Sequence, residues 1–138
     1  MSDHIIQSAI GRPTCIALDI CHHIIDDVHT RHKTLVGVFQ SIVVPQIPLF
    51  YPQLYVMATL GEGMGHLSVT LSIRAPSGAE IRRMHNEADL AAPDNVVEMV
   101  FQILNLPILE PGLYFVDLLL DNAPLASRRF YVHLQQSR

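Results

Sequence analysis

Charged residues are scarce in this sequence, and their scarcity limits the partners that it can have. Only 16% of the 138 residues are Asp, Glu, Lys or Arg, whereas soluble domains carry about 25%. The formal net charge is −4, which argues against a sequence-independent grip on nucleic acid, because such a grip needs a basic stripe. We therefore expect no nucleic-acid partner. Since 49% of the residues are apolar, we expect one globular domain with a sizeable core.

Motifs that carry catalysis are also missing. The sequence contains no Gly-x-Ser-x-Gly elbow, no phosphate-binding P-loop and no dinucleotide fingerprint. The glycine-rich run GEGMG at 61–65 lacks the lysine and the following helix of a phosphate-binding loop, and is typical of a hairpin loop. These absences favour a protein that is not an enzyme and that needs no cofactor.

Only two cysteines occur, Cys15 and Cys21. On one extended strand their Cα atoms would lie about 20 Å apart, which is beyond the reach of a disulfide. We therefore expect two reduced thiols and a cytoplasmic protein. Residues 1–13 lack the cationic and apolar regions of a secretory signal. We expect them to form a flexible lead to a single domain at 14–134, with a short tail at 135–138.

A convincing amphipathic helix is not present in the sequence. The stretch Thr34–Gly61 contains no charged residue and is long enough to span a bilayer. Its three prolines would break a helix, however, and its three glutamines would be costly in lipid. We expect buried strands here and no membrane partner.

Strand patterns fill the chain instead. Apolar alternation and β-branched residues, separated by turn signals, predict about eight strands, at 14–25, 34–44, 54–60, 67–74, 80–89, 96–106, 113–121 and 125–134. This spacing predicts an all-β fold, an antiparallel β-sandwich of the immunoglobulin-like or C2-like kind. Because 34–44 is apolar on both faces, we expect a central strand there. We expect the proline-rich run at 45–52 to cross from one sheet to the other.

Period-two alternation also predicts the core. The side chains expected to be buried are Leu67, Val69, Leu71, Ile73, Tyr114, Val116, Leu118, Phe130 and Val132. Tyr114 closely follows the turn Glu110-Pro111-Gly112, a placement similar to the tyrosine corner of immunoglobulin-like sandwiches.

One run is rich in groups that bind metals. Residues 21–33, CHHIIDDVHTRHK, hold a thiol, four histidines and two carboxylates, and zinc or another divalent ion accepts such ligands. In one reading His29, His32 and Asp26 form a metal site, where the two histidines converge if the turn is helical. In the other reading the run is a solvated polar turn. A weaker alternative is a calcium or lipid site that uses Asp26-Asp27 and the carboxylates from Asp89 to Asp94.

Two arginine doublets stand out from the neutral background, Arg82-Arg83 and Arg128-Arg129. Neighbouring residues of a strand face opposite ways, so each doublet presents one arginine outward. We expect these arginines to be solvated partners of nearby carboxylates: Glu80, Glu87 or Asp117.

The order of these segments resembles a known family. The resemblance lies in CIALDICHHIIDD (15–27), KTLVGVF (33–39), VPQIPLFYPQLY (44–55), Pro111–Phe115 and Arg129–Val132. These segments are similar to those of uncharacterised bacterial β-sandwich proteins, a domain of unknown function. The resemblance covers about Cys15 to Val132 and implies the sandwich fold. It implies no catalytic residue and no ligand.

Sequence therefore predicts a non-enzymatic interaction or structural module whose partner is its own copy or another protein. A homodimer is favoured because the crossing carries apolar residues without an obvious partner in the chain: Ile47, Leu49, Phe50 and Tyr51. Contiguous apolar patches are rare on monomers, and a two-fold contact would cover this one. The alternative is a small metal-binding or catalytic domain at the Cys21–His32 turn.

Overall fold

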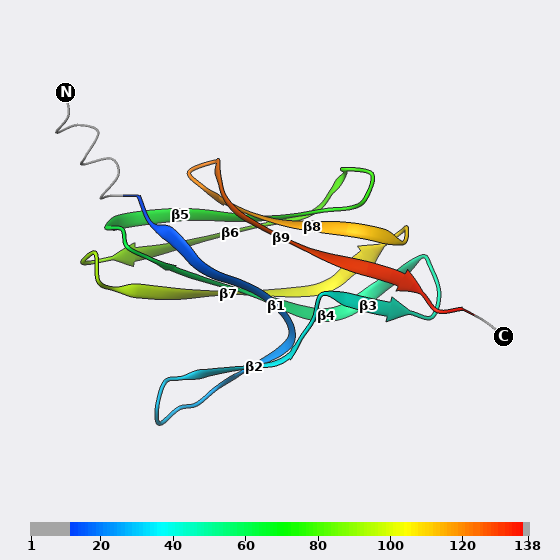
Figure 1. Cartoon of the computed structure of the whole chain (residues 1–138), viewed down its shortest axis with the longest axis horizontal. Helices are drawn as coiled ribbons and strands as arrows, with labels where there is room; N and C mark the ends of the chain where they lie inside the picture. Colours follow the sequence, from blue (N-terminus) through cyan, green and yellow to red (C-terminus); the bar gives the residue numbers. More distant parts are fainter. Residues whose placement is uncertain (1–11, 137–138) are drawn as a thin grey trace.

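Residues 12–136 are the part of the chain that the computed structural model describes, and they form nine strands. The strands are β1 (Thr14–Asp26), β2 (Lys33–Val38), β3 (Ser41–Val44), β4 (Leu49–Gly61), β5 (Gly65–Arg74), β6 (Glu80–Leu90), β7 (Val96–Ile108), β8 (Gly112–Leu120) and β9 (Ala123–Leu134). They build a four-stranded sheet in the order β2-β1-β4-β7 and a five-stranded sheet in the order β3-β9-β8-β5-β6. Figure 1 shows the two sheets stacked as layers. The predicted all-β sandwich is confirmed. Residues 1–11 of the lead expected at 1–13, and residues 137–138 of the tail expected at 135–138, lie outside the described part.

Most neighbouring strands run antiparallel, and β3 with β9 is the parallel pair. β8 and β9 form a hairpin, and Asp121 and Asn122 at its turn have φ values of 49° and 67°. Two such left-handed residues match the twist of the flanking strands. The GEGMG run is not a hairpin loop, because β4 and β5 belong to different sheets. Glycines signal a chain reversal, but they do not specify which sheet the next strand joins.

The core lies between the two sheets, where the inward side chains of both meet. All nine residues predicted to be buried are buried. From the four-stranded sheet they face Leu54, Val56, Leu60, Phe101 and Ile103. Alternation predicted these positions because a strand with one solvated face must place every second side chain in the core.

Tyr114 forms the tyrosine corner that its position predicts. Its hydroxyl donates a 2.6 Å hydrogen bond to the carbonyl oxygen of Glu110. Its ring stacks on Phe130, with centroids 5.4 Å apart. Burial raises the pKa of Tyr114, because the charged phenolate would lose its water.

The segment predicted as one central strand, 34–44, is divided between the two sheets. The amide of Phe39 donates to Ile20 of β1 at 3.0 Å, and the carbonyl of Gln40 accepts from Tyr131 of β9 at 2.9 Å. The chain thus passes from the edge of one sheet to the edge of the other. The prediction of a central strand is wrong, because the two apolar faces belong to a strand that changes sheets and not to one covered on both sides.

The proline-rich run crosses between the sheets as predicted, but over a shorter length. β3 lies in the five-stranded sheet and β4 begins at Leu49 in the four-stranded one, so the crossing spans 45–48. Pro52 lies inside β4, on a part that pairs with β7 but lies beyond the last pair with β1, Cys21 with Tyr55. Proline is tolerated there because one edge of the strand has no neighbour.

Candidate functional site

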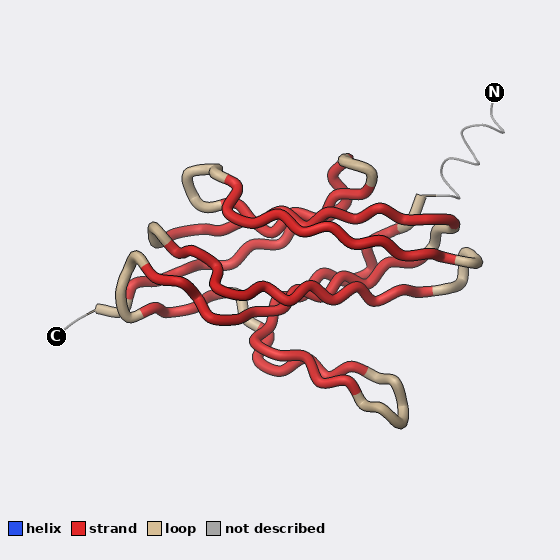
Figure 2. Tube along the Cα trace, turned by 180° about the vertical axis from the view of Figure 1, so that it is seen from behind, coloured by secondary structure: helices blue, strands red, loops and turns tan. Residues whose placement is uncertain are grey.

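A two-stranded hairpin projects from the sandwich (Figures 1 and 2). β1 pairs with β4 as far as Cys21, and beyond it pairs with β2 up to the last pair, Asp26 with Lys33. We call residues 22–38 the arm. Figure 2 shows the arm directed away from the two layers. Near the tip of the arm, Lys33 Nζ lies 3.8 Å from a carboxylate oxygen of Glu98 on β7.

The tip of the arm is shaped by Asp27. Its carboxylate accepts hydrogen bonds from the backbone amides of His29 at 2.8 Å and Thr30 at 3.1 Å. These bonds, that from Thr30 first, lower the pKa of Asp27 because they stabilise the charged form. Asp27 therefore organises a polar turn, which agrees with the second reading of residues 21–33, a solvated polar turn.

The residues considered as metal ligands lie at this tip without converging. Asp26 accepts a hydrogen bond from Lys33 Nζ at 3.2 Å. His29 and His32 are exposed. Among residues 12–136, no group of three or more His, Cys, Asp or Glu side chains could hold a metal ion. The described structure thus offers no ligand set for the metal hypothesis or for the calcium alternative.

The other two histidines of the run pack on aromatic rings at the base of the arm. The rings of His22 and Phe39 have centroids 4.7 Å apart, and His22 Nδ1 lies 3.4 Å from the Tyr51 hydroxyl. His23 meets the edge of Tyr55 at 5.6 Å. These contacts anchor the arm where it leaves the sheet.

Both cysteines are free thiols on β1. Cys21 is fully buried beside the base of the arm, and Cys15 is half-buried. Burial raises the pKa of both thiols, because an apolar surrounding disfavours the thiolate. They are not bonded to each other, as their spacing predicted.

One face of the arm is apolar and open to solvent. Ile25, Val36 and Val38 are 49%, 42% and 53% exposed. Their cross-strand neighbours are Thr34, His23 and Cys21, so this face carries no Lys, Arg, Asp or Glu. The opposite face is half-buried at Ile24 and Leu35. The arm thus presents a neutral surface of β-branched side chains.

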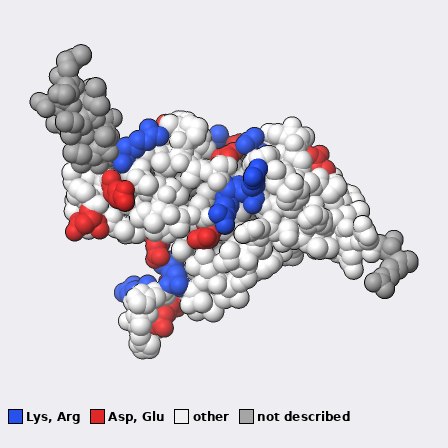
Figure 3. Space-filling model, in the orientation of Figure 1, with Lys and Arg blue, Asp and Glu red and all other residues white. Residues whose placement is uncertain are grey.

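A second neutral surface lies on the body of the molecule. In Figure 3 the area to the right of the arm, over β3 and β4, is white, which means that no charged side chain lies on it. Phe50 of β4 is 69% exposed. Ile47, Leu49 and Tyr51, which sequence reasoning grouped with Phe50, instead pack against the core. The expectation of four unpartnered residues is therefore corrected to one.

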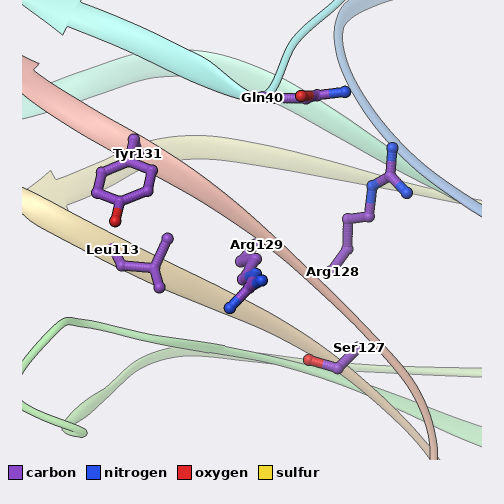
Figure 4. A pocket seen from close by; sticks show the side chains of 6 residues that line it. All are labelled: Gln40, Leu113, Ser127, Arg128, Arg129 and Tyr131. Carbon is purple, nitrogen blue, oxygen red and sulfur yellow. The ribbon is translucent and has the colours of Figure 1, made fainter.

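The two arginine doublets differ in their partners. Arg83 pairs with Glu80 at 3.2 Å, as expected, and Arg82 donates to the carbonyl of Asn105 at 3.2 Å. Arg128 and Arg129 line a hollow at the edge of β9 (Figure 4). In residues 12–136 neither makes an ion pair. Asp117, their expected partner, pairs with Arg74 at 2.6 Å instead.

Sequence reasoning missed a histidine held between two carboxylates. His66 of β5 lies with Nε2 2.7 Å from Glu87 and Nδ1 2.8 Å from Asp89, both on β6. The hydrogen bond to Glu87, followed by that to Asp89, raises the pKa of His66. The β5–β6 register places His66 opposite Asp89 and next to Glu87, so a register prediction for this hairpin would have found the cluster.

The arm, the β9 edge and the two sheets together match a described family. The model of the family of unknown function DUF6941 matches residues 17–133. The chain belongs to this family. The match spans β1 to β9, so the DUF6941 domain contains the arm and both sheets. The resemblance seen in the sequence is confirmed.

Solved structures show that the DUF6941 fold recurs in other settings. The DNA glycosylase AlkC of Pseudomonas fluorescens, bound to DNA with an abasic site analogue, superposes with a TM-score of 0.56 at 12% identity; the match covers 95% of this chain and 33% of that one. The C-terminal domain of Wzt gives 0.53 at 15% identity, over 93% and 76%. An immunoglobulin-like protein of Pseudomonas aeruginosa gives 0.46 at 12% identity, over 91% and 99%. This chain spans about a third of the glycosylase, and likenesses at such low identity show the fold alone.

The remaining comparisons add two findings. The sequence matches no protein that has a curated description. Between Arg12 and Gln136 there is no helix long and apolar enough to cross a bilayer.

Proposed function

We propose that this protein is a non-enzymatic interaction module that forms a homodimer through its arm. The observation that carries the proposal is the apolar face of the arm, on which Ile25, Val36 and Val38 are open to solvent. An isolated two-stranded hairpin is only marginally stable in water. A contact that covers this face therefore stabilises the arm and holds the partner at the same time.

A second copy suits this surface because the surface is neutral. The face consists of Ile, Val, Thr and His side chains around a buried thiol, so two copies meet there at neutral pH without a like-charge pair. A two-fold contact presents the same patch from both chains and needs no other surface. Phe50, on the same sheet, supplies further apolar area.

Sedimentation velocity at micromolar concentration tests the proposal. We expect the wild-type protein to sediment with about twice the chain mass of 15.4 kDa. Val36→Lys buries one cation from each copy in the contact, and we expect it to sediment as the 15.4 kDa chain. The matched control is Val43→Lys, because Val43 is an exposed valine outside the arm, on β3, and at 63% is more open to solvent than Val36 at 42%. We expect this control to remain dimeric.

Two results contradict the homodimer. One is a wild-type protein that sediments as a single 15.4 kDa species at every concentration. The other is equal dissociation of Val36→Lys and Val43→Lys, which would move the contact away from the arm. A circular dichroism spectrum of each variant verifies that the sandwich is folded.

We also propose that the protein works in the cytoplasm. The free, buried thiols Cys15 and Cys21 support this location, since a reducing compartment keeps cysteines unpaired. Neither the arm nor its contact requires a cofactor.

A further inference from the structure

The edge of β9 is open over much of its length. β8 pairs with β9 from Ala123 to Val132, whereas β3 pairs with the other side of β9 from Tyr131 to Leu134. In the described part of the chain, no strand pairs with the β3 side of residues 123–130. Pro124 has no amide hydrogen and its carbonyl accepts a hydrogen bond from Arg12 at 3.5 Å. The rest of this edge, 125–130, presents unpaired backbone amides and carbonyls and is a template for an added strand.

This open edge is rich in hydrogen-bond donors, and no acidic residue lines the hollow beside it. A hollow of about 500 Å³ lies here. The residues that line it are Gln40, Leu113, Ser127, Arg128, Arg129 and Tyr131. None of them is acidic, so an incoming anion meets two guanidinium groups, an amide and a phenol.

The arginines are free because the nearby acid is already occupied. Both oxygens of Asp117 are engaged, one by Arg74 at 2.6 Å and the other by the Ser127 hydroxyl at 2.8 Å. Arg128 and Arg129 are exposed, and within residues 12–136 neither donates a side-chain hydrogen bond. Two unpaired cations thus sit at the edge of a protein whose net charge is −4.

The two guanidinium groups do not converge on one point. Figure 4 shows Arg128 and Arg129 on opposite sides of the β9 ribbon, with Arg128 on the side of Gln40. Consecutive residues of a strand alternate in this way, and so would consecutive residues of a strand added beside β9. Two neighbouring acidic residues of an added strand would therefore meet one arginine each. A single phosphate or carboxylate could not reach both.

We propose that the open edge of β9 binds an extended acidic peptide by strand addition. Its backbone pairs with residues 125–130, and two successive Asp or Glu side chains pair with Arg128 and Arg129. This site is independent of the arm, which lies on the other sheet, so it does not rest on the proposed homodimer. Arginines also protect bare edges from aggregation, and the experiment separates this role from peptide binding.

Fluorescence anisotropy with synthetic peptides tests the site. The probe is a labelled peptide of about eight Thr and Val residues, which is strand length, with a central Glu-Glu pair. We expect saturable binding that weakens about two- to fivefold in each of Arg128→Gln and Arg129→Gln, as exposed ion pairs do. Arg31→Gln is the matched control, because it removes the same charge from the arm tip. We expect it to bind as the wild type does.

Two further peptides distinguish strand addition from simple charge attraction. A peptide with Gln-Gln in place of Glu-Glu should bind more weakly to the wild type. A Glu-Glu peptide N-methylated at alternate residues, on the edge that would face β9, cannot donate the ladder hydrogen bonds and should lose binding. Equal binding of the methylated peptide would overturn the proposal, as would unchanged binding to both arginine variants or no binding to the wild type.

Discussion

At the scale of single residues, the corner at Tyr114 couples a turn to the core. The hydroxyl reaches back to Glu110 while the ring is fully buried against Phe130. A polar group at this depth must have a partner, because desolvation without one costs free energy. The bond thus fixes the entry of β8 relative to the turn that precedes it.

Tyr114→Phe removes this bond and leaves the aromatic packing in place. We expect the free energy of unfolding to fall by about 1–3 kcal/mol, because the Glu110 carbonyl loses its donor. Urea unfolding measures the change. Tyr131→Phe, at an exposed tyrosine of β9, is the control and should change stability by no more than about 0.5 kcal/mol. Equal effects would show that the corner bond contributes nothing of its own.

Leu71 allows the same kind of stability test at an apolar core residue. It lies in the middle of β5 and is fully buried between the sheets. We expect Leu71→Ala to lower the free energy of unfolding by about 2–5 kcal/mol, through lost transfer free energy and the cavity left behind. The control is Leu104→Ala, at an exposed leucine of β7, and a similar loss in both variants would contradict the assigned core.

At the scale of elements, β5 and β6 are joined across their outer face by His66. The hydrogen bonds to Glu87 and Asp89 raise the pKa of His66, and the bond from His66 lowers the pKa of Glu87. A raised histidine pKa gives stability that is full below the unfolded value of 6.5 and is lost as pH rises through the folded pKa. A lowered carboxyl pKa gives stability that is present above 4.5 and is lost as pH falls.

The pair should therefore stabilise the hairpin most between pH 4.5 and pH 6.5. We expect the difference in unfolding free energy between wild type and His66→Gln to be largest in this window and to shrink as pH rises above 6.5 through the raised pKa of His66. Urea unfolding at several pH values measures it. His29→Gln, at the arm tip, is the control, because His29 forms no carboxylate pair within the described residues. The same pH profile in both variants would rule out the pair as its cause.

The strands were predictable from sequence to different degrees, and the reason is physical. β5, β8 and β9 each turn one face toward the core, so alternation marks their inward residues, Leu71 and Val116 among them. The segment 34–44 has apolar residues on both faces for another reason, since its halves join different sheets. An extended segment has the same local pattern in either sheet. Which sheet each half of 34–44 joins depends on its distant hydrogen-bond partners, Ile20 and Tyr131.

The candidate sites were harder to predict than the strands. Sequence reasoning found the run at 21–33 because histidines and carboxylates are conspicuous, but chemistry alone did not reveal that the run forms a projecting arm. The opening beside Arg128 arises because β3 stops pairing at Tyr131. Strand length depends on contacts between residues far apart in the chain, which local patterns do not contain.

At the scale of the whole molecule, the segment between Lys33 and Val44 links the two layers on one side of the sandwich. Its first half, β2, is an edge strand of the four-stranded sheet, and its second half, β3, is an edge strand of the five-stranded sheet. The two layers are thus tied by continuous backbone as well as by the core between them. On the opposite side the edges are β7 and β6.

This tie has a consequence for how the protein is made. β3 cannot find its partner until Tyr131–Leu134 have left the ribosome, because those residues are the end of β9. Until then Ser41–Val44 has no strand to pair with, and unpaired strands are prone to associate with other nascent chains. Ribosomes that follow one another on a single message would hold several such strands close together. The five-stranded sheet is therefore completed by its latest strand in the sequence, β9, and not by its earliest, β3.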